Sequence, residues 1–364
     1  MKMIRFTKQL PGLLALATVT AFTGCKKDDP EPQPSGGTAS SYYSSGVFVT
    51  NEGPFGSGTG TVSFYDRTTG TVSSDIFETK NGYPLGNIVQ SMEIYNGSAY
   101  IVVNNSGKVE VVDPQTFAAS GTISGLTYPR YFLGISPTKG YISEWGAGGV
   151  SGSVKVVDLS TKMVTSTIVT GKGADEMVVS GSSVYVACSG GFDNDSVVTV
   201  INSTTNSVIT SINVGANPKS MKLDANGKIW VLCSGQWDPT YSFLEKPGKL
   251  VRIDPSGNTV DLSLPFSSTF SQPSGLVVNS TGTTLYYSYS GGVYSQAYNA
   301  SSLSGSPVIS RSFYGLGVDP ANNYLYASDA GDFVSNGKVL RYTPSAALVD
   351  SFTVGVIPGN FCFK

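Results

Sequence analysis

The sequence predicts an all-β protein, a seven-bladed β-propeller with four antiparallel strands in each blade. The composition is the first observation behind this prediction, with 43 glycines, 20 tyrosines and only 13% charged residues. The second is that runs of Val, Ile, Thr and Ser are interrupted by Gly, Asn, Asp and Pro, which is typical of strands joined by turns. The third is a pattern that repeats about every 45 residues, a period typical of propeller blades.

The repeat is most regular in two units, Ile88–Pro129 and Asp175–Pro218. Each unit begins with a short apolar strand, such as EMVVS, and a small turn leads to a second strand, such as VYVAC. A Gly-rich loop then precedes a third strand that ends in Asp or Asn, and a fourth strand ends near Gly. Four strands that alternate apolar and polar residues make one blade.

The units also predict how the ring closes. The segment Gly46–Asn87 holds only the second, third and fourth strands of a blade, whereas the final segment Gly359–Phe363 is a spare first strand. We expect this last strand to complete the N-terminal blade and so remove the free edge. Because the sixth unit is the least regular, six or eight blades remain alternatives. The six fuller units begin near Ile88, Arg130, Asp175, Lys219, Ser274 and Leu316.

The N-terminal residues predict export. Basic residues precede an apolar run over residues 10–22, which is the order of a secretory signal. The run is shorter than the roughly 20 residues that span a membrane, although an uncleaved anchor is an alternative. Residues rich in Pro, Gly and Ser follow, as in an unfolded tether. We therefore expect a signal peptide over 1–24, a tether over 25–45 and the propeller over 46–364.

The segment AFTGC, which ends at Cys25, resembles a bacterial lipobox with Phe22 in place of the usual leucine. The following KKDD resembles the signal that sends lipoproteins of the Bacteroidetes to the outer face of the outer membrane. The resemblance implies a lipid on Cys25 as the only attachment to a membrane, with the protein facing the cell exterior. A solvated charge cluster at the start of a linker is the alternative.

The segment VFVTN (Val47–Asn51) and similar segments at Val184–Ala187 and Ile229–Leu232 resemble the YVTN-type, or YncE-like, β-propellers. The stretch Asn51–Asp66 resembles a blade opening in a branch of Bacteroidetes surface lipoproteins. The resemblance covers residues 46–364. Some similar proteins bind cobalamin beside a TonB-dependent transporter, so the resemblance implies nutrient capture, but the function has to be argued from the site.

The chain contains no histidine, which removes imidazole from the available general bases, nucleophile activators and metal ligands. The acidic residues of the predicted loops belong to different blades, so we expect neither a metal ion nor another cofactor. A propeller enzyme that uses carboxylates alone is the least favoured alternative. A formal net charge of −2 gives no reason to expect a nucleic acid as partner.

The cysteines of the predicted propeller are expected to be free. Cys188 and Cys233 occupy the same position in the second strands of neighbouring blades. Equivalent strands of adjacent blades lie further apart than the ~4.4–6.8 Å between Cα atoms that a disulfide requires. We therefore expect these residues and Cys362 to be small buried side chains without a chemical role.

One end of the predicted ring carries long loops that contain aromatic residues. Loops between second and third strands lie at the same end as the connections between blades, and these segments are long, whereas the opposite end has compact turns. We expect Arg130 and Lys219, each opening a first strand, to lie nearest the axis and to meet a ligand or to bridge Glu176 or Glu93. The candidate ligand-binding residues are Trp145, Trp237, Arg130, Lys219, Tyr131, Phe192, Tyr241 and Tyr83.

These observations favour a monomeric outer-membrane lipoprotein that captures a small nutrient, cobalamin-like or another substrate of a TonB-dependent transporter, and is not an enzyme. The alternative is an adhesin that binds a protein or a glycan with the same face. Asp195-Ser196-Val197 resembles the Bacteroidetes O-glycosylation sequon, and a sugar on Ser196 would weaken the capture hypothesis.

Overall fold

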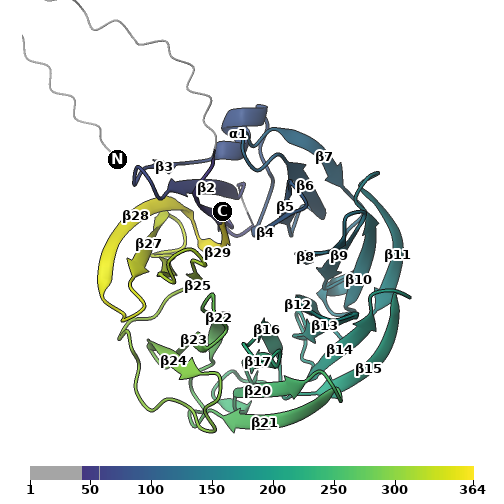
Figure 1. The fold of residues 1–364 in the computed structure, drawn as a ribbon, viewed down its shortest axis with the longest axis vertical. Helices are drawn as coiled ribbons and strands as arrows, with labels where there is room; N and C mark the ends of the chain where they lie inside the picture. The colour runs from purple at the N-terminus through teal and green to yellow at the C-terminus, as the bar shows by residue number, and fades with distance from the viewer. Residues whose placement is uncertain (1–42, 57) are drawn as a thin grey trace, which may run out of the picture. The chain divides into compact units, whose positions relative to one another are not determined.

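The computed structural model describes residues 43–56 and 58–364, which form a closed ring of seven blades around a central axis (Figure 1). The predicted propeller is therefore confirmed. The predicted lipidation site, Cys25, lies outside the described residues. None of the helices in the described part is long and apolar enough to span a membrane.

The first blade contains both ends of the described chain. The C-terminal strand β29 is its innermost strand and pairs antiparallel with β1, as the sequence predicted. Beside this closure, Nε of Arg67 donates to the Asp319 carboxylate at 2.6 Å, and Arg67 also donates to the Lys364 carbonyl oxygen. We call the ion pair of Arg67 and Asp319 the clamp. The strands of this blade are β29 (Pro358–Phe363), β1 (Gly46–Asn51), β2 (Thr61–Asp66) and β3 (Val72–Ser73).

The fourth strand of the first blade is much shorter than predicted. The fourth strand expected within Gly46–Asn87 is the segment TVSSDIF (residues 71–77), but only β3 is extended, and the helix α1 (Ile76–Asn81) follows. The adjacent apolar residues Ile76 and Phe77 are both buried, which a strand with one buried face does not allow but a helical turn does. The side chain of Asn81 then joins α1 to the second blade through the Phe117 carbonyl oxygen and the Ala119 N–H.

The second to fifth blades each contain four strands in chain order from the axis outward. The second and third are β4 (Val89–Tyr95), β5 (Ser98–Val103), β6 (Lys108–Val112), β7 (Ala119–Ile123), and β8 (Pro129–Ser136), β9 (Lys139–Glu144), β10 (Ser153–Asp158), β11 (Met163–Val169), with a 3-10 turn at Ala147–Gly149. The fourth and fifth are β12 (Ala174–Ser180), β13 (Ser183–Cys188), β14 (Val197–Asn202), β15 (Ser207–Asn213), and β16 (Pro218–Leu223), β17 (Ile229–Cys233), β20 (Lys249–Asp254), β21 (Thr259–Pro265).

The sixth blade is the irregular one, as its sequence indicated. It has three strands, and a single bridge between Val293 and Ile309 stands in place of the fourth. The seventh blade again has four strands. The strands of these two blades are β22 (Ser274–Val278), β23 (Thr284–Tyr289), β24 (Gly292–Ala297), and β25 (Gly315–Val318), β26 (Leu325–Asp329), β27 (Asn336–Tyr342), β28 (Leu348–Val356).

The turns between third and fourth strands explain why third strands end in Asp or Asn. The Asp113 carboxylate accepts hydrogen bonds from the N–H groups of Gln115 and Thr116, at 2.8 and 2.7 Å. Asp66 and Asn202 cap the equivalent turns in the same way. A short side chain that carries an oxygen thus accepts hydrogen bonds from the N–H groups of its own turn, and the strand ends there. We call this end of the ring, which carries the turns after first and third strands, the turn face.

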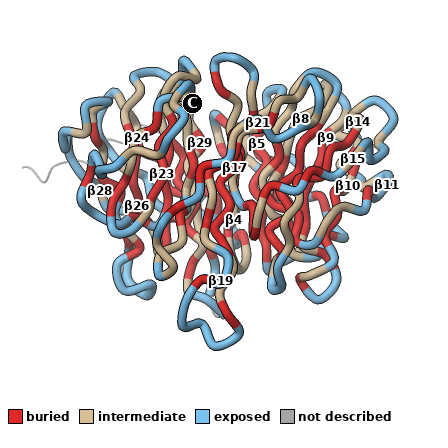
Figure 2. The backbone as a smooth tube through the Cα atoms, turned by 90° about the horizontal axis from the view of Figure 1, so that it is seen from below, coloured by how far each residue is buried: buried red, intermediate tan, exposed pale blue. Residues whose placement is uncertain are grey.

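The opposite end, the loop face, carries the loops after second strands and the connections between blades. Backbone hydrogen bonds join these two kinds of segment, for example from Asn217 N–H to the Asp195 carbonyl oxygen at 2.7 Å. The longest loop contains a hairpin, β18 (Gln236–Trp237) with β19 (Leu244–Lys246), that projects beyond the ring (Figure 2). Hydrophobic side chains pack between neighbouring blades, so the core is itself a ring around the axis.

Candidate functional site

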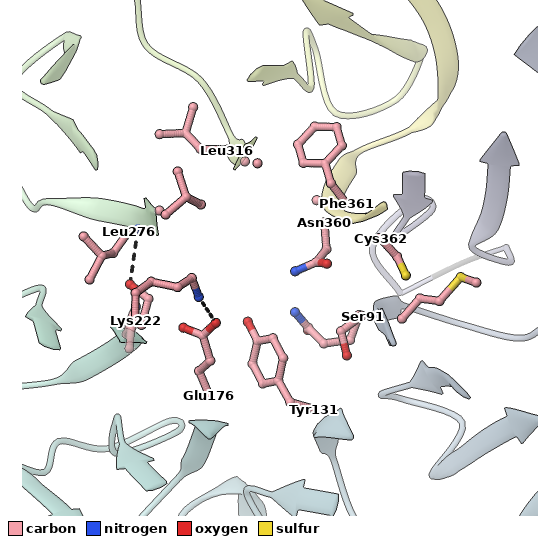
Figure 3. A pocket seen from close by; sticks show the side chains of 18 of the residues that line it. Ser91, Tyr131, Glu176, Lys222, Leu276, Leu316, Asn360, Phe361 and Cys362 are labelled. Carbon is pink, nitrogen blue, oxygen red and sulfur yellow. Dashed lines mark hydrogen bonds and ion pairs between the residues drawn. The ribbon is translucent and has the colours of Figure 1, made fainter. Parts of the chain in front are cut away.

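The innermost strands surround a cavity of about 790 Å³ on the axis of the ring. Side chains from all seven blades line it, and Figure 3 shows Tyr131, Glu176 and Asn360 with their polar atoms toward its centre. The volume lies in the range of roughly 300–1,000 Å³ that small-molecule sites occupy. The axial cavity is therefore the candidate functional site.

The same backbone conformation recurs before several first strands and places polar side chains at the mouth of the cavity on the loop face. In five blades the residue before the first strand has a left-handed backbone, a conformation that costs a β-branched residue about 1–2 kcal/mol. The register of the first strand then shifts by one residue. In four of these blades the side chain of the second residue after the left-handed one lines the cavity, namely Gln90, Arg130, Asp175 and Lys219, whereas the first blade has Gly359 at this position. The left-handed residues are Ile88 (φ 61°), Tyr128 (φ 52°), Gly173 (φ 61°), Asn217 (φ 55°) and Ile357 (φ 54°).

Arg130 is the most constrained polar residue of the cavity. Its Nε donates to the Asp175 carboxylate at 2.9 Å, and its Nη1 donates to the side-chain oxygen Oε1 of Gln90. The guanidinium lies over the Trp145 ring, 4.3 Å from the ring centroid. A guanidinium fixed on three sides loses little freedom when it binds a ligand with Nη2, which has no hydrogen-bond partner among the described residues.

The cavity carboxylates, in contrast, are already engaged by protein groups. Asp175 accepts from Arg130 and from the Ser189 hydroxyl at 2.7 Å. Glu176 accepts from the Lys222 ammonium and from the Met221 N–H. Glu52 accepts from the Tyr314 hydroxyl at 3.0 and 3.1 Å. Each of these three carboxylates therefore already has at least one donor within the protein.

Several donors in the same wall have no such partner. The Lys219 ammonium forms no ion pair with any described residue, and it is exposed to the cavity. The Tyr131 hydroxyl, the Asn360 carboxamide and the Gln90 amide nitrogen are also without a hydrogen-bond partner in the described part of the chain. The wall therefore presents several donors that have no partner within the described residues.

Burial changes the acid–base behaviour of this wall. It lowers the pKa of Lys219, an effect that the Asp175 carboxylate opposes and Arg130 reinforces. Burial raises the pKa of Glu52, although the Tyr314 hydroxyl and Arg130 counteract this effect. It raises the pKa of Glu93 to about 7, against one hydrogen bond from the Gly134 N–H. Each shift reflects desolvation of the charged form.

The cavity brings together Arg130, Tyr131 and Lys219 of the sequence-predicted site residues. The other candidates lie outside it. Trp145 is behind Arg130, and its ring packs edge-on against Phe192 with centroids 5.2 Å apart. Tyr83 follows α1 and packs against Phe77. The two remaining candidates, Trp237 and Tyr241, belong to the projecting hairpin.

The predicted ion pairs of the two basic residues were wrong. Arg130 pairs with Asp175, whereas Glu176 pairs with Lys222. Glu93 pairs with neither. The reason is the register of the first strands. Pro129 lies opposite Glu144, and Ala174 lies opposite Cys188 in the next blade. The residues that follow, Arg130 and Asp175, therefore occupy equivalent positions on adjacent blades, and their side chains meet.

Sequence reasoning missed Gln90, Asp175, Asn360 and Glu52 as cavity residues. A signal for two of them was present. Gln90 and Asp175 stand at the same repeat position as Arg130 and Lys219, so aligning the units on their first strands would have identified them. Within the described residues no group of three or more acidic residues or cysteines could hold a metal ion. Cys188, Cys233 and Cys362 are free and buried, as predicted.

The sequence was compared with protein-family models and with curated proteins. A family model described as "Domain of unknown function (DUF5074)" matches residues 45–342. The chain belongs to this family. Among curated proteins no match was found.

Solved structures similar to this DUF5074 chain share its fold. A quinonprotein alcohol dehydrogenase-like protein from Bacteroides thetaiotaomicron is 16% identical with a TM-score of 0.67, covering 88% of this chain and 79% of its own. The periplasmic gluconolactonase of Pseudomonas aeruginosa is 12% identical, with a TM-score of 0.63 and coverages of 87% and 98%. A protein from Lactobacillus plantarum is 14% identical, with a TM-score of 0.64 and coverages of 88% and 99%. At these identities the likeness shows the fold alone.

Proposed function

We propose that this chain is a binding protein, not an enzyme, that captures a small nutrient in the axial cavity at the outer surface of the cell. One observation carries the proposal: several donors of the cavity wall, above all the Lys219 ammonium and the Tyr131 hydroxyl, have no partner among the described residues, while Asp175 and Glu176 are each held by a cation. Donors without partners suit a ligand that is rich in hydrogen-bond acceptors. Carboxylates held by cations, such as Asp175 and Glu176, are poorly placed to act as general bases or nucleophiles.

The proposal includes a lipid on Cys25 that holds the protein on the outer membrane, and membership of the YncE-like surface lipoproteins. The N-terminal sequence AFTGCKKDD supports the lipid anchor, and the segment VFVTN (Val47–Asn51) supports the YncE-like membership. A corrinoid is the first ligand to test, because its ring of amides offers many carbonyl acceptors to the donors of the mouth. Other transporter substrates, such as haem and siderophores, are the next candidates.

A TonB-dependent transporter is the proposed partner, docked on the loop face. Exposed aromatic side chains support this surface, because such residues are enriched in protein interfaces. Apart from Tyr83, the exposed aromatic residues in the described ranges lie in loops of this face. They are Phe55, Phe192, Tyr241, Phe243, Phe270, Tyr314 and Phe333.

The test is calorimetric titration of the purified protein with cobalamin, haem and a siderophore. Under the proposal one of them binds, and Tyr131→Phe or Asn360→Ala weakens it about ten-fold, the value of one good hydrogen bond. Tyr298→Phe is the matched control, because Tyr298 lies outside the cavity. If none of the three binds, these transporter substrates are excluded as the ligand, and if Tyr298→Phe weakens binding as much as Tyr131→Phe, the axial cavity is not the binding site.

An adhesin remains the second candidate, favoured by the projecting hairpin. Tyr241 is 79% exposed at its tip and has a strained left-handed backbone (φ 56°). The Asp238 carboxylate accepts hydrogen bonds from Thr240, Ser242 and Phe243, which fixes the tip. The double variant Tyr241→Ser, Phe243→Ser separates the candidates: it abolishes attachment to glycan-coated or protein-coated beads if the chain is an adhesin, and leaves small-ligand affinity unchanged if it captures a nutrient.

A further inference from the structure

The wall of the axial cavity has two different halves. Blades two to five line it with charged and polar side chains, whereas blades six, seven and one line it mainly with apolar ones. Figure 3 shows Leu276, Leu316 and Phe361 along one side and Tyr131 with Glu176 along the other. The apolar lining residues are Leu276, Val277, Val278, Leu316, Val318, Phe361 and Phe363.

The apolar half is available to a ligand. Val277, Val318 and Phe361 are only half-buried, and they belong to β22, β25 and β29, the innermost strands of their blades. All three line the cavity, so their remaining surface contributes to its wall. Most apolar lining residues of the polar half expose less surface: Met92, Phe132 and Leu232 are 6%, 3% and 1% exposed, whereas Ile94 is half-buried.

Lys219 is the cation of the polar half that has no ion pair. Arg130 and Lys219 lie on either side of Asp175 in blade order, and both charges act on this carboxylate. Asp175 is already bonded to Arg130 and Ser189, so it leaves Lys219 without a partner. Glu176 pairs with Lys222. Neither of the other lining carboxylates pairs with Lys219, because Glu52 is bonded to Tyr314 and Glu93 accepts from the Gly134 N–H.

The unpaired ammonium of Lys219 defines the charge of the group that the ligand presents to it. One unpaired ammonium beside a fixed guanidinium suits a single anionic group. A dianion such as a phosphate monoester would place its second charge near Asp175 and Glu52, which repel it. Apolar surface on the facing half then favours a ligand whose body is hydrocarbon, because burial of apolar area contributes about 25 cal/mol per Å².

We propose that the axial cavity selects a small organic carboxylate with an apolar body. Its carboxylate binds the Lys219 ammonium and Nη2 of Arg130, and its hydrocarbon part lies against Val277, Val318 and Phe361. This inference rests on the proposed capture function and defines its ligand class.

The experiment compares four probes by calorimetry on the purified protein: 3-phenylpropionate, 3-phenylpropanol, 3-phenylpropylamine and acetate. The alcohol and the amine keep the apolar body without the anion, and acetate keeps the anion without the body. We expect 3-phenylpropionate to bind at least about ten-fold more tightly than each of the others, since it alone uses both halves. Equal affinity for the carboxylate, the alcohol and the amine overturns the proposal.

Two variants test which half of the cavity wall contacts the carboxylate of the ligand and which contacts its apolar body. Lys219→Met is expected to weaken 3-phenylpropionate about ten-fold and to leave 3-phenylpropanol unchanged. Val318→Thr keeps the shape of the side chain, makes the apolar wall polar and is expected to weaken 3-phenylpropionate without affecting acetate. Lys80→Met on α1 is the matched control, because Lys80 is exposed and far along the chain from every lining residue of its blade. If Lys219→Met does no more than Lys80→Met, the assignment is wrong.

Cobalamin in the same titration separates the two proposals. If cobalamin binds and none of the aromatic probes does, the ligand class proposed here is wrong while the capture function stands. If 3-phenylpropionate binds only through sites that Lys219→Met and Val318→Thr leave intact, the axial cavity is not the site, and the inference fails. If none of these compounds, haem or siderophores binds, both proposals fail.

Discussion

The two ends of the ring use polar side chains in opposite ways. On the turn face polar groups bond to the protein itself: Asp113 caps its own turn, Arg67 clamps Asp319, and the Tyr185 hydroxyl reaches Asn258 of the next blade. At the mouth on the loop face, Lys219 and Tyr131 have no partner among the described residues. The polar groups of the turn face therefore stabilise the ring, whereas those at the mouth are available to bind a ligand.

The comparison predicts which substitutions change stability and which change binding. Removing a satisfied group at the turn face leaves its partner unpaired, and such losses are large. Removing an unpaired donor at the mouth breaks no contact within the protein. Sites that keep unused polar groups commonly forgo stability for function.

The largest effect is expected for Arg67→Met. Asp319 is fully buried, so the substitution leaves an unpaired carboxylate in the seam between the first and last blades, at a cost of about 3–5 kcal/mol in the free energy of unfolding. Urea denaturation followed by tryptophan fluorescence measures it. Asp319→Asn with Arg67→Met, which removes both charges, is expected to recover part of the loss, and a single variant as stable as the parent would contradict the role of the clamp.

The next effect concerns Glu93, deep in the cavity. Its folded pKa of about 7 lies above the ordinary 4.5, so the folded protein keeps the proton to higher pH than the unfolded chain. Stability should therefore fall as pH rises from about 4.5 to about 7 and then stay constant, with a total loss of at most about 3 kcal/mol. Glu93→Gln should remove this dependence. Denaturation midpoints at intervals across this pH range would show an unchanged slope in the variant if Glu93 is not responsible.

A much smaller effect on stability is expected at the mouth. Lys219→Met should change the free energy of unfolding by no more than about 0.5 kcal/mol, because the ammonium has no ion pair to lose. The same denaturation series as for Arg67→Met gives the direct comparison. A loss as large as that of Arg67→Met would mean that Lys219 holds the ring together, and the contrast between the two ends would disappear.

We expect that a thiol reagent does not modify the cysteines of the propeller in the native protein. Burial raises the pKa of Cys188 to about 11 and those of Cys233 and Cys362 to about 12, so the reactive thiolate is scarce at neutral pH. Mass spectrometry after treatment with iodoacetamide should find these three residues unmodified until denaturant is added. Modification of Cys362 alone would show that the cavity wall opens in the native state.

The blades were predictable from sequence because each repeats the same local chemistry. Strand starts agree with the structure to one residue at Val89, Pro129 and Ala174, and the Asx turns end third strands where the sequence has Asp or Asn. The helix α1 was not predictable in this way, since it departs from the repeat and depends on packing against the Phe117 turn.

The cavity was only partly predictable. Arg130 and Lys219 were placed at the axis because they open first strands, and they do line it. Their partners depend on which side chains meet across blades, which a one-dimensional repeat does not contain. Trp145 shows the difference: its loop was expected to present the ring to a ligand, but the ring supports Arg130 from behind.

The closing strand β29 has a consequence for the timing of synthesis. Asn360 and Phe361 belong both to this strand and to the cavity wall, and the Thr50 hydroxyl meets the Asn360 carbonyl oxygen across 310 positions of sequence. Contacts at such separation form slowly, after local turns and hairpins. The cavity is therefore incomplete until residues 358–363 have left the ribosome and reached the first blade. A partly synthesised chain has no closed pocket in which to hold a ligand, so ligand binding distinguishes finished molecules from unfinished ones.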